Sequence, residues 1–280
     1  MPAQPRRPLP EPIPVQGRRP PLWLVAVLLV LFEVPTVVYL ARGLPKQSIR
    51  DALTRGFAWM ELVAALVIAA VVLVGRYRQA VGWVPRHGVR RAVQGIALAL
   101  VATSLVLLLS SAVELGWSAG KTGVLVANVL LIGVVEETLF RGLLWSSLPR
   151  QWTATRILLV TSVLFGAWHI LNGFTTGDWR GSALQAGIAA LLGLGLGAIR
   201  LRTGWLGLGI VTHAAIDAGV TAASLAAGHL VRDHATPALL VLSLLVFEIL
   251  YVTLAVTGIV VLIRTAMAER RARRLVVAAV

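Results

Sequence analysis

The sequence of 280 residues contains no cysteine and only two lysines, and it is poor in charged residues. Without cysteine, disulfide bonds, thiolate catalysis and cysteine-ligated metal sites are excluded. Charged residues make up 14% of the chain, whereas a soluble domain carries about 25%. Acidic residues number 12 against 26 basic ones, so the net charge is +14. This composition does not favour an ordinary soluble enzyme.

Hydrophobic residues dominate the sequence and account for 58% of it. Several apolar runs reach the roughly 18 to 20 residues with which a helix crosses a bilayer core of about 30 Å. Strands of a membrane barrel would alternate polar and apolar residues, which these runs do not. We predict an all-α, polytopic membrane helical bundle of about eight transmembrane helices. The predicted helices cover residues 22–40, 57–75, 92–113, 123–147, 155–172, 183–199, 204–226 and 237–263.

The chain outside these runs is rich in proline or arginine at both ends. Residues 1–20 are predicted to be a disordered, basic N-terminal tail. Residues 21–263 form the predicted transmembrane domain, whose first helix is too long for the core of a signal peptide. Residues 264–280 are predicted to be a basic cytoplasmic tail. No pattern fixes the oligomeric state.

The arginines predict the orientation in the membrane. They precede the first predicted helix, recur in 76–91, 150–156 and 200–202, and follow residue 263, while the intervening loops are nearly neutral. By the positive-inside rule, the protein is a multi-pass protein of the cell membrane with both termini in the cytoplasm. The same arginines are available to anionic lipids. The high share of arginine over lysine indicates a bacterial source.

Two further observations bear on these basic residues. The loop 41–56 is basic where the positive-inside rule expects neutrality, so it either lies along a membrane surface or follows a helix that does not fully cross. The basic residues are not interleaved with aromatic residues on which bases would stack, so nucleic acid is not an expected partner.

Ionisable residues inside the predicted helices are the most informative ones, because each costs several kcal/mol unless it faces protein or water. The helix 123–147 contains Glu136, Glu137 and Arg141 near its middle. Glu137 and Arg141 are four residues apart, so they share a helix face and can pair. Glu136 points about 100° away from Glu137 and is left without this partner.

Two later helices carry histidines in matching positions. Phe165 and His169 share a face of one helix, and His213 and Asp217 share a face of another. Counting 1.5 Å per residue, Glu136, His169 and His213 lie roughly 17, 21 and 14 Å from the cytoplasmic ends of their helices. Three helices can therefore bring one carboxylate and two imidazoles to a common point within the membrane.

Such a group is suited to hydrolysis. A carboxylate removed from bulk water becomes a usable general base, and a neighbouring histidine can position the water. A second histidine, oriented by Asp217, can donate a hydrogen bond to the oxyanion of a tetrahedral intermediate. Alternatively, Glu136, His169 and His213 match the two histidines and one carboxylate of a catalytic zinc site. The residues alone leave both routes open.

The order Glu136-Glu137 with Arg141, then Phe165-x-x-x-His169, then His213-x-x-x-Asp217 resembles the three motifs of the CPBP family of intramembrane proteases. This family includes the CAAX prenyl endopeptidases and bacterial bacteriocin-processing and self-immunity (Abi-like) proteins. The resemblance covers about residues 95–225, the predicted protease-like core, and also includes the glycine-rich stretch 192–195 and the stretch 200–204.

The resemblance implies an intramembrane endopeptidase that hydrolyses a peptide bond of a membrane-associated protein or peptide. Glu136 and His169 would activate water, and His213 and Asp217 would stabilise the oxyanion. Glu137, Arg141 and Phe165 would support the site. Both glutamate-dependent and metal-dependent mechanisms have been attributed to this family. Position 217 is often asparagine in the family, whereas an ionised aspartate cannot donate a hydrogen bond. Asp217 would then orient His213 or be protonated.

Two other classes of function fit the same acids. A proton- or ion-coupled transporter would use them as relays, and Glu33, Glu61 and Glu248 add further acids in or near predicted helices. A non-catalytic membrane scaffold would retain them for structure alone. A serine protease is not expected, because Ser118, in Gly-x-Ser-x-Gly, links two membrane helices and lacks the strand that a nucleophile elbow requires.

Overall fold

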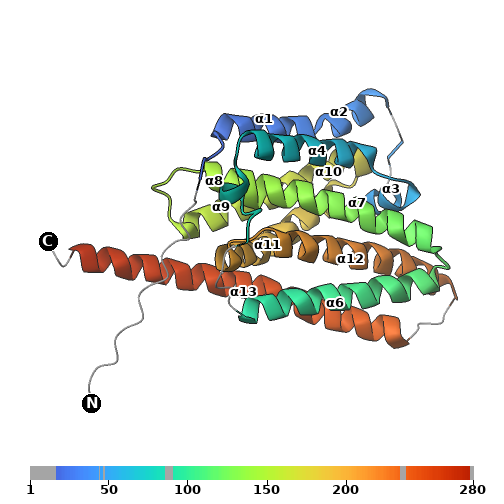
Figure 1. Cartoon of the computed structure of the whole chain (residues 1–280). Coiled ribbons are helices and arrows are strands. Elements are labelled where there is room, and N and C mark those ends of the chain that lie inside the picture. The colour runs from blue at the N-terminus through green and yellow to red at the C-terminus, as the bar shows by residue number, and fades with distance from the viewer. Residues whose placement is uncertain (1–16, 44, 47, 86–90, 234–237, 278–280) are drawn as a thin grey trace, which may run out of the picture.

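The computed structural model describes residues 17–43, 45–46, 48–85, 91–233 and 238–277, and all regular elements in this part of the chain are helices. Figure 1 shows the long helices lying side by side as a bundle. In chain order the elements are α1 (Leu22–Phe32), α2 (Val34–Ala41), α3 (Ile49–Arg55), α4 (Trp59–Val74), α5 (Arg78–Val81), α6 (Arg91–Glu114), α7 (Ala119–Glu137), the π-helix η1 (Thr138–Leu144), α8 (Trp145–Ser147), α9 (Ala154–Trp168), the 3₁₀ helix η2 (His169–Leu171), α10 (Asn172–Thr176), α11 (Trp179–Thr203), α12 (Gly207–Asp233) and α13 (Ala238–Val277).

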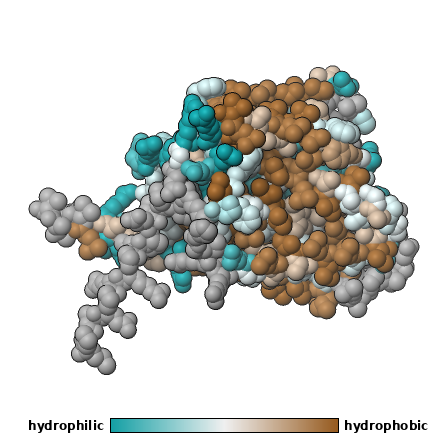
Figure 2. All heavy atoms as spheres, in the orientation of Figure 1, coloured by the Kyte–Doolittle hydropathy of each residue, from teal (hydrophilic) through white to brown (hydrophobic). Residues whose placement is uncertain are grey.

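The outer surface of the bundle is that of a membrane protein. Six helices of the described chain are long and apolar enough to cross a bilayer, and the bent pair α3 and α4 makes a seventh if it counts as one span. Figure 2 shows hydrophobic residues covering the side of the bundle, with hydrophilic residues gathered at one end. The predicted all-α polytopic bundle is confirmed, with a number of spans close to the eight expected.

The first predicted helix is interrupted, which corrects the continuous helix expected over 22–40. It is divided into α1 and α2 at Glu33, whose backbone has φ −85° and ψ −4°. Pro35 follows two residues later, and proline has no amide hydrogen to donate to the preceding turn. Together α1 and α2 form an apolar unit shorter than a full span.

The basic segment before α4 turns away from the bundle axis. The helix α3 is bent by 88° from α4, so it does not continue the direction of that helix. The buried side chain of Asn128 on α7 holds the bend: it donates to the carbonyls of Leu53 and Gly56 and accepts from the amide of Ala58, each at 2.8 Å. One amide side chain thus satisfies backbone groups that a broken helix leaves unpaired.

The two ends of the chain differ from each other. Most of the predicted N-terminal tail, residues 1–16, lies outside the described residues. At the other end, α13 continues as a helix to Val277, so the predicted end at 263 is wrong. Alanine, arginine, glutamate and leucine dominate this extension and favour helix. Glu269 connects this extension to the bundle, because its carboxylate accepts a hydrogen bond from the amide of Thr155, at the start of α9, at 3.1 Å. Figure 1 shows the extension leaving the bundle.

The predicted site residues lie on α7, η1, α9, η2 and α12, which pack together with α11. The helix α11 packs against α9 and α13, and α12 packs against α6 and α7. Close approach depends on small residues: a Cβ atom on Gly133 of α7 would lie 3.1 Å from the carbonyl oxygen of Ile210 on α12. This contact is one turn before Glu136 and Glu137, so it brings their turn of α7 against α12.

Candidate active site

The two predicted acids lie where the geometry of their helix changes. Glu136 and Glu137 are the last residues of α7, and the chain continues as the π-helix Thr138–Leu144. All residues of the π-helix are buried. Such helices are rare and occur frequently at functional sites. The sequence predicted a regular helix through this region, because hydrophobic periodicity does not distinguish a short π-helix from an α-helix.

Glu137 and Arg141 form the predicted ion pair. Arg141 Nη1 donates to Glu137 Oε1 at 2.9 Å, and both side chains are completely buried. The guanidinium carbon of Arg141 also lies 4.0 Å from the centre of the Phe165 ring, a cation–π contact. A buried pair is costly to desolvate but more costly to break, because one charge would then be left alone.

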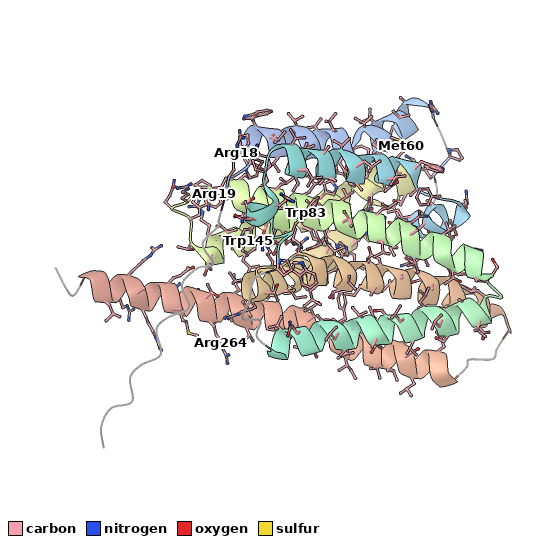
Figure 3. All side chains as sticks on the ribbon, in the orientation of Figure 1. Arg18, Arg19, Met60, Trp83, Trp145 and Arg264 are labelled. Atoms are coloured by element: carbon pink, nitrogen blue, oxygen red, sulfur yellow. The ribbon has the colours of Figure 1, made fainter. Side chains whose placement is uncertain are left out.

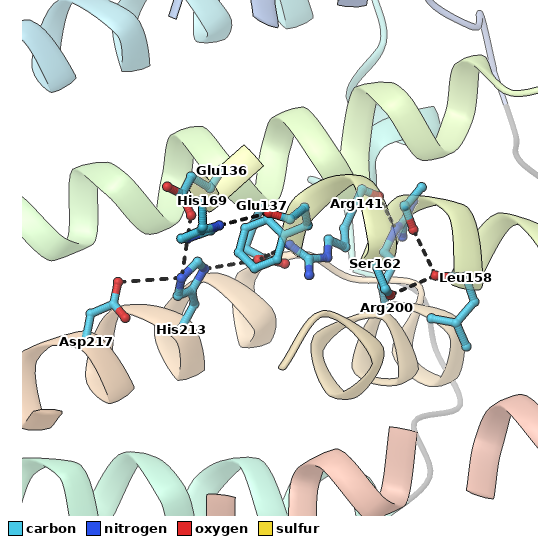
Figure 4. Close-up of polar contacts among 11 residues, drawn as sticks. Glu136, Glu137, Arg141, Leu158, Ser162, His169, Arg200, His213 and Asp217 are labelled. Carbon is cyan, nitrogen blue, oxygen red and sulfur yellow. Dashed lines mark hydrogen bonds and ion pairs between the residues drawn. The ribbon is translucent and has the colours of Figure 1, made fainter. Parts of the chain in front are cut away.

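His213 lies among three carboxylates (Figure 4). Its Nδ1 atom is 3.1 Å from Oε1 of Glu137, the same oxygen that binds Arg141. Its Nε2 atom is 3.7 Å from Oε2 of Glu136 and 3.5 Å from Oδ2 of Asp217. The hydrogen bond that orients the imidazole therefore involves Glu137, and the sequence had assigned this orienting role to Asp217. Asp217 and Glu136 instead face the opposite ring nitrogen.

His169 is positioned by its own helix. Its Nδ1 atom is 2.8 Å from the carbonyl oxygen of Phe165. A carbonyl only accepts, so Nδ1 carries the proton, and in the neutral ring Nε2 is left with a lone pair. Among the described residues, no other hydrogen bond or ion pair joins His169 to a site residue. The Phe165 ring links the two histidines, with its centre 4.8 Å from that of His169 and 5.7 Å from that of His213.

Burial within the site decreases in one direction. Glu137 and Arg141 are fully buried, and Glu136 and His213 nearly so. The side chain of Asp217, by contrast, is 34% exposed, and His169 is only half-buried. The side of the site next to the π-helix is thus buried. Asp217 and His169 form its more exposed side.

Unpaired polar atoms are concentrated at this site. In the described chain, seven buried side-chain nitrogen or oxygen atoms have no hydrogen-bond partner, and four of them belong to Glu136, Glu137 and Arg141. Leaving such an atom unpaired costs about 1–3 kcal/mol, and more for a charged group. Stability alone does not explain this concentration, which is typical of a site that binds or reacts.

The arrangement of the histidines and carboxylates bears on the alternative zinc site. In the part of the chain that the structure describes, no three histidine, aspartate or glutamate side chains are arranged to hold a metal ion. The suggested set of Glu136, His169 and His213 is included in this result. Glu136 and His213 instead face each other at 3.7 Å, and His169 makes no polar contact with either. The residues as placed do not fit a three-ligand metal centre.

Three further residues support the site, and none of them was among the site residues predicted from sequence. Trp83, in the loop after α5, donates from Nε1 to Oγ1 of Thr138 at the start of the π-helix, at 3.3 Å; Figure 3 shows its position beside the central helices. Arg200, counted as a loop charge, is buried at the end of α11. Gly193, in the glycine-rich stretch 192–195, lies against Arg141: a Cβ atom there would be 2.9 Å from Nη2. Each is recognised only when separate helices are brought together.

The remaining acids and the serine motif fall outside this cluster. Glu33 lies at the break between α1 and α2. Glu61 and Glu248 make no ion pair among the described residues. Ser118 is the N-cap of α7, where its hydroxyl accepts from the amide of Lys121 at 3.2 Å. It is separated from Glu136 by nearly the whole length of that helix.

Comparison with known proteins supports the resemblance seen in the sequence. Residues 117–219 match the family model described as type II CAAX prenyl endopeptidase Rce1-like. Neither the curated proteins nor the solved structures contain a match to the chain. The matched segment lies within the predicted core of about 95–225 and contains all seven predicted site residues. The match of residues 117–219 to this Rce1-like family model is consistent with the resemblance to CPBP family proteases.

Proposed function

We propose that the protein is a glutamate-dependent intramembrane endopeptidase that hydrolyses a peptide bond of a membrane-associated protein or peptide. The observation that carries this proposal is the buried contact of His213 with Glu136, Glu137 and Asp217 inside the bundle. The family match supports the endopeptidase class, and the burial of these groups supplies the low-dielectric surroundings in which oriented charges act strongly.

The first step is the activation of water by Glu136 and His169. Glu136 Oε2 is buried without a hydrogen-bond partner among the described residues, and the lone pair of His169 Nε2 is available when the ring is neutral. Water held between them gives one proton to Glu136 as its oxygen bonds to the carbonyl carbon of the substrate. The product is a tetrahedral intermediate with a negative oxygen.

The second step requires a donor for that oxygen. When His213 carries protons on both ring nitrogens, Glu137 holds Nδ1–H and leaves Nε2–H to donate to the oxyanion. Asp217 lies 3.5 Å from Nε2. When ionised, it accepts a hydrogen bond from this N–H; when protonated, it can itself donate to the oxyanion. As the carbon–nitrogen bond breaks, Glu136 returns the proton to the leaving amine. The overall reaction is therefore simple hydrolysis of the peptide bond.

The ion pair of Glu137 and Arg141 has a positioning role in this scheme. It fixes the oxygen that binds His213 Nδ1, and neither side chain is exposed enough to meet a substrate. A substrate would reach the site from the side of Asp217 and His169, where exposure is greatest. The substrate is expected to be a protein or peptide already in or on the membrane.

The decisive test is the isosteric substitution Glu136→Gln. Membranes that contain the native chain are compared with those that contain the variant, and peptides released only by the native chain are identified. Cleavage should fall by a factor of about 10² or more, as expected when a general base is removed. Glu248→Gln is the matched control, because Glu248 is an exposed acid of α13 that forms no ion pair among the described residues. Retained cleavage in Glu136→Gln would rule out this mechanism.

The rival functions give different results in the same experiment. A transporter that used Glu136 as a relay would lose pH-dependent flux in proteoliposomes and release no peptide. A scaffold would keep its cellular phenotype with Glu136→Gln. A zinc-dependent protease would lose cleavage on treatment with a chelator and regain it with zinc. The proposed mechanism predicts cleavage that survives the chelator and is lost with Glu136.

A further inference from the structure

Arg200 is the other deeply buried guanidinium of the described chain. It lies in the last turn of α11, and only 6% of the residue is exposed. Its Nε atom donates to the carbonyl of Arg141 at 3.2 Å, and Nη2 donates to the carbonyl of Ala80 at 2.8 Å. Nη1 donates to the carbonyl of Gly204. One side chain therefore joins α11 to backbone groups of three segments.

The most informative of these contacts is with the π-helix. Arg141 is its fourth residue and carries the guanidinium that pairs with Glu137. The chain of contacts runs from Arg200 to the backbone of Arg141, from its side chain to Glu137, and from Glu137 to His213. Figure 4 shows Arg200 behind Arg141 on the side away from Asp217. The side chain of Arg200 thus contacts the site at the backbone of Arg141.

The surrounding chain is shaped to receive this guanidinium. Gly82 adopts φ +83°, and a Cβ atom there would overlap the guanidinium, with Nη2 only 2.8 Å away. The carbonyl of Gly82 accepts from the amide of Leu206 at 2.8 Å, and the adjacent Trp83 binds Thr138. The α5 loop and Arg200 consequently hold the π-helix at its first and fourth residues.

We propose that Arg200 is a positioning residue for the proposed hydrolysis, holding the π-helix in the register that presents Glu137 to His213. This inference rests on the proposed function for the reaction that is affected. The position of His213 is a separate property that can be measured without any cleavage assay. Arginine is required because its planar fork reaches three carbonyls in fixed directions. Lysine keeps the charge but not this geometry.

The test uses the full chain in lipid nanodiscs with ¹⁵N-labelled histidine. Arg200→Lys and Arg200→Gln are compared with Arg264→Lys, a matched exchange at an exposed position of α13. The side-chain nitrogen signal of His213, assigned by its loss in His213→Gln, should shift or broaden in both Arg200 variants and stay unchanged in Arg264→Lys. In the cleavage assay, kcat should fall about tenfold or more with KM nearly constant, as small misplacements of reacting groups lower rate more than binding.

The outcomes separate positioning from stability and from function. Arg200→Lys that folds with a native His213 signal and native kcat would overturn the inference. A lower melting temperature with unchanged His213 signal and kcat would also overturn it, since the role would then be structural alone. If the native chain cleaves no peptide, the proposed function fails, and a displaced His213 signal in Arg200→Lys still supports positioning.

Discussion

At the scale of single residues, one oxygen atom organises the site. Oε1 of Glu137 accepts from Arg141 at 2.9 Å and lies 3.1 Å from Nδ1 of His213. It therefore links the ion pair to the imidazole that faces Glu136. The adjacent acids have different surroundings as a result: Glu137 is paired on both sides, while Glu136 has only the longer contact with His213.

Removing the charge of Glu137 should mainly reduce stability. Glu137→Gln leaves the guanidinium of Arg141 buried without its carboxylate, which typically costs about 3–5 kcal/mol. The double variant Glu137→Leu with Arg141→Met should be less destabilised, because no unpaired charge remains. Thermal or denaturant unfolding of the purified chain in nanodiscs measures both. An unfolding midpoint of Glu137→Gln equal to that of the native chain would contradict a strong buried pair.

At the scale of elements, the site depends on how closely α11 approaches the π-helix. Gly193 lies at the crossing, where a Cβ atom would be 2.9 Å from Arg141 Nη2 and 3.1 Å from Cβ of Ser162. The absence of a side chain lets the buried guanidinium lie directly against the helix backbone. The π-helix on the other side of Arg141 is held by Trp83 and Arg200.

Two glycine substitutions on α11 should have opposite effects. Gly193→Ala is expected to displace Arg141 and to cost about 1–3 kcal/mol, the usual penalty for overpacking. Gly187→Ala is the control on the same helix, because a Cβ atom there meets no neighbour within 4 Å. It should stabilise the chain by about 0.5–1 kcal/mol, since alanine favours helix over glycine. Equal stability changes for the two variants would refute this account of Gly193.

At the scale of the whole molecule, hydrophobic residues cover the side of the bundle and hydrophilic residues gather at one of its ends (Figure 2). Figure 3 places Arg18, Arg19 and Arg264 at the same end of the bundle. The α7 end that begins at Ala119 is at the other. At about 1.5 Å per residue, the 40 residues of α13 reach about 60 Å, roughly twice the thickness of a bilayer core. Its C-terminal part must therefore leave the membrane.

The orientation can be measured by labelling, because the chain has no cysteine of its own. We expect Ala119→Cys to react with a membrane-impermeant maleimide in intact cells. Ala272→Cys, on the arginine-rich extension of α13, should react only after the membrane is opened, as the positive-inside rule requires. Both positions are exposed. Labelling of Ala272→Cys in intact cells would reverse the proposed orientation.

The sequence alone determined the class of fold and the identity of the candidate residues. Long apolar runs cross a membrane because lipid cannot satisfy an unpaired backbone, so helices follow from composition. Glu136, His169 and His213 were identifiable because an ionisable group in lipid is costly unless it has a function or a partner. The pairing of Glu137 with Arg141 followed from helical spacing within one segment.

Only the tertiary structure decided how these residues meet. Helical periodicity relates residues of one helix but carries no information on which helix lies next to it. It therefore could not show that Glu137, rather than Asp217, bonds to Nδ1 of His213. The π-helix depends on contacts from Trp83 and Arg200, which are distant in sequence. Arg200 was interpreted from sequence as a loop charge and as part of the stretch 200–204 of the family resemblance. Neither predicts that neighbouring segments bury its side chain, because burial is a property of packing and not of the local sequence.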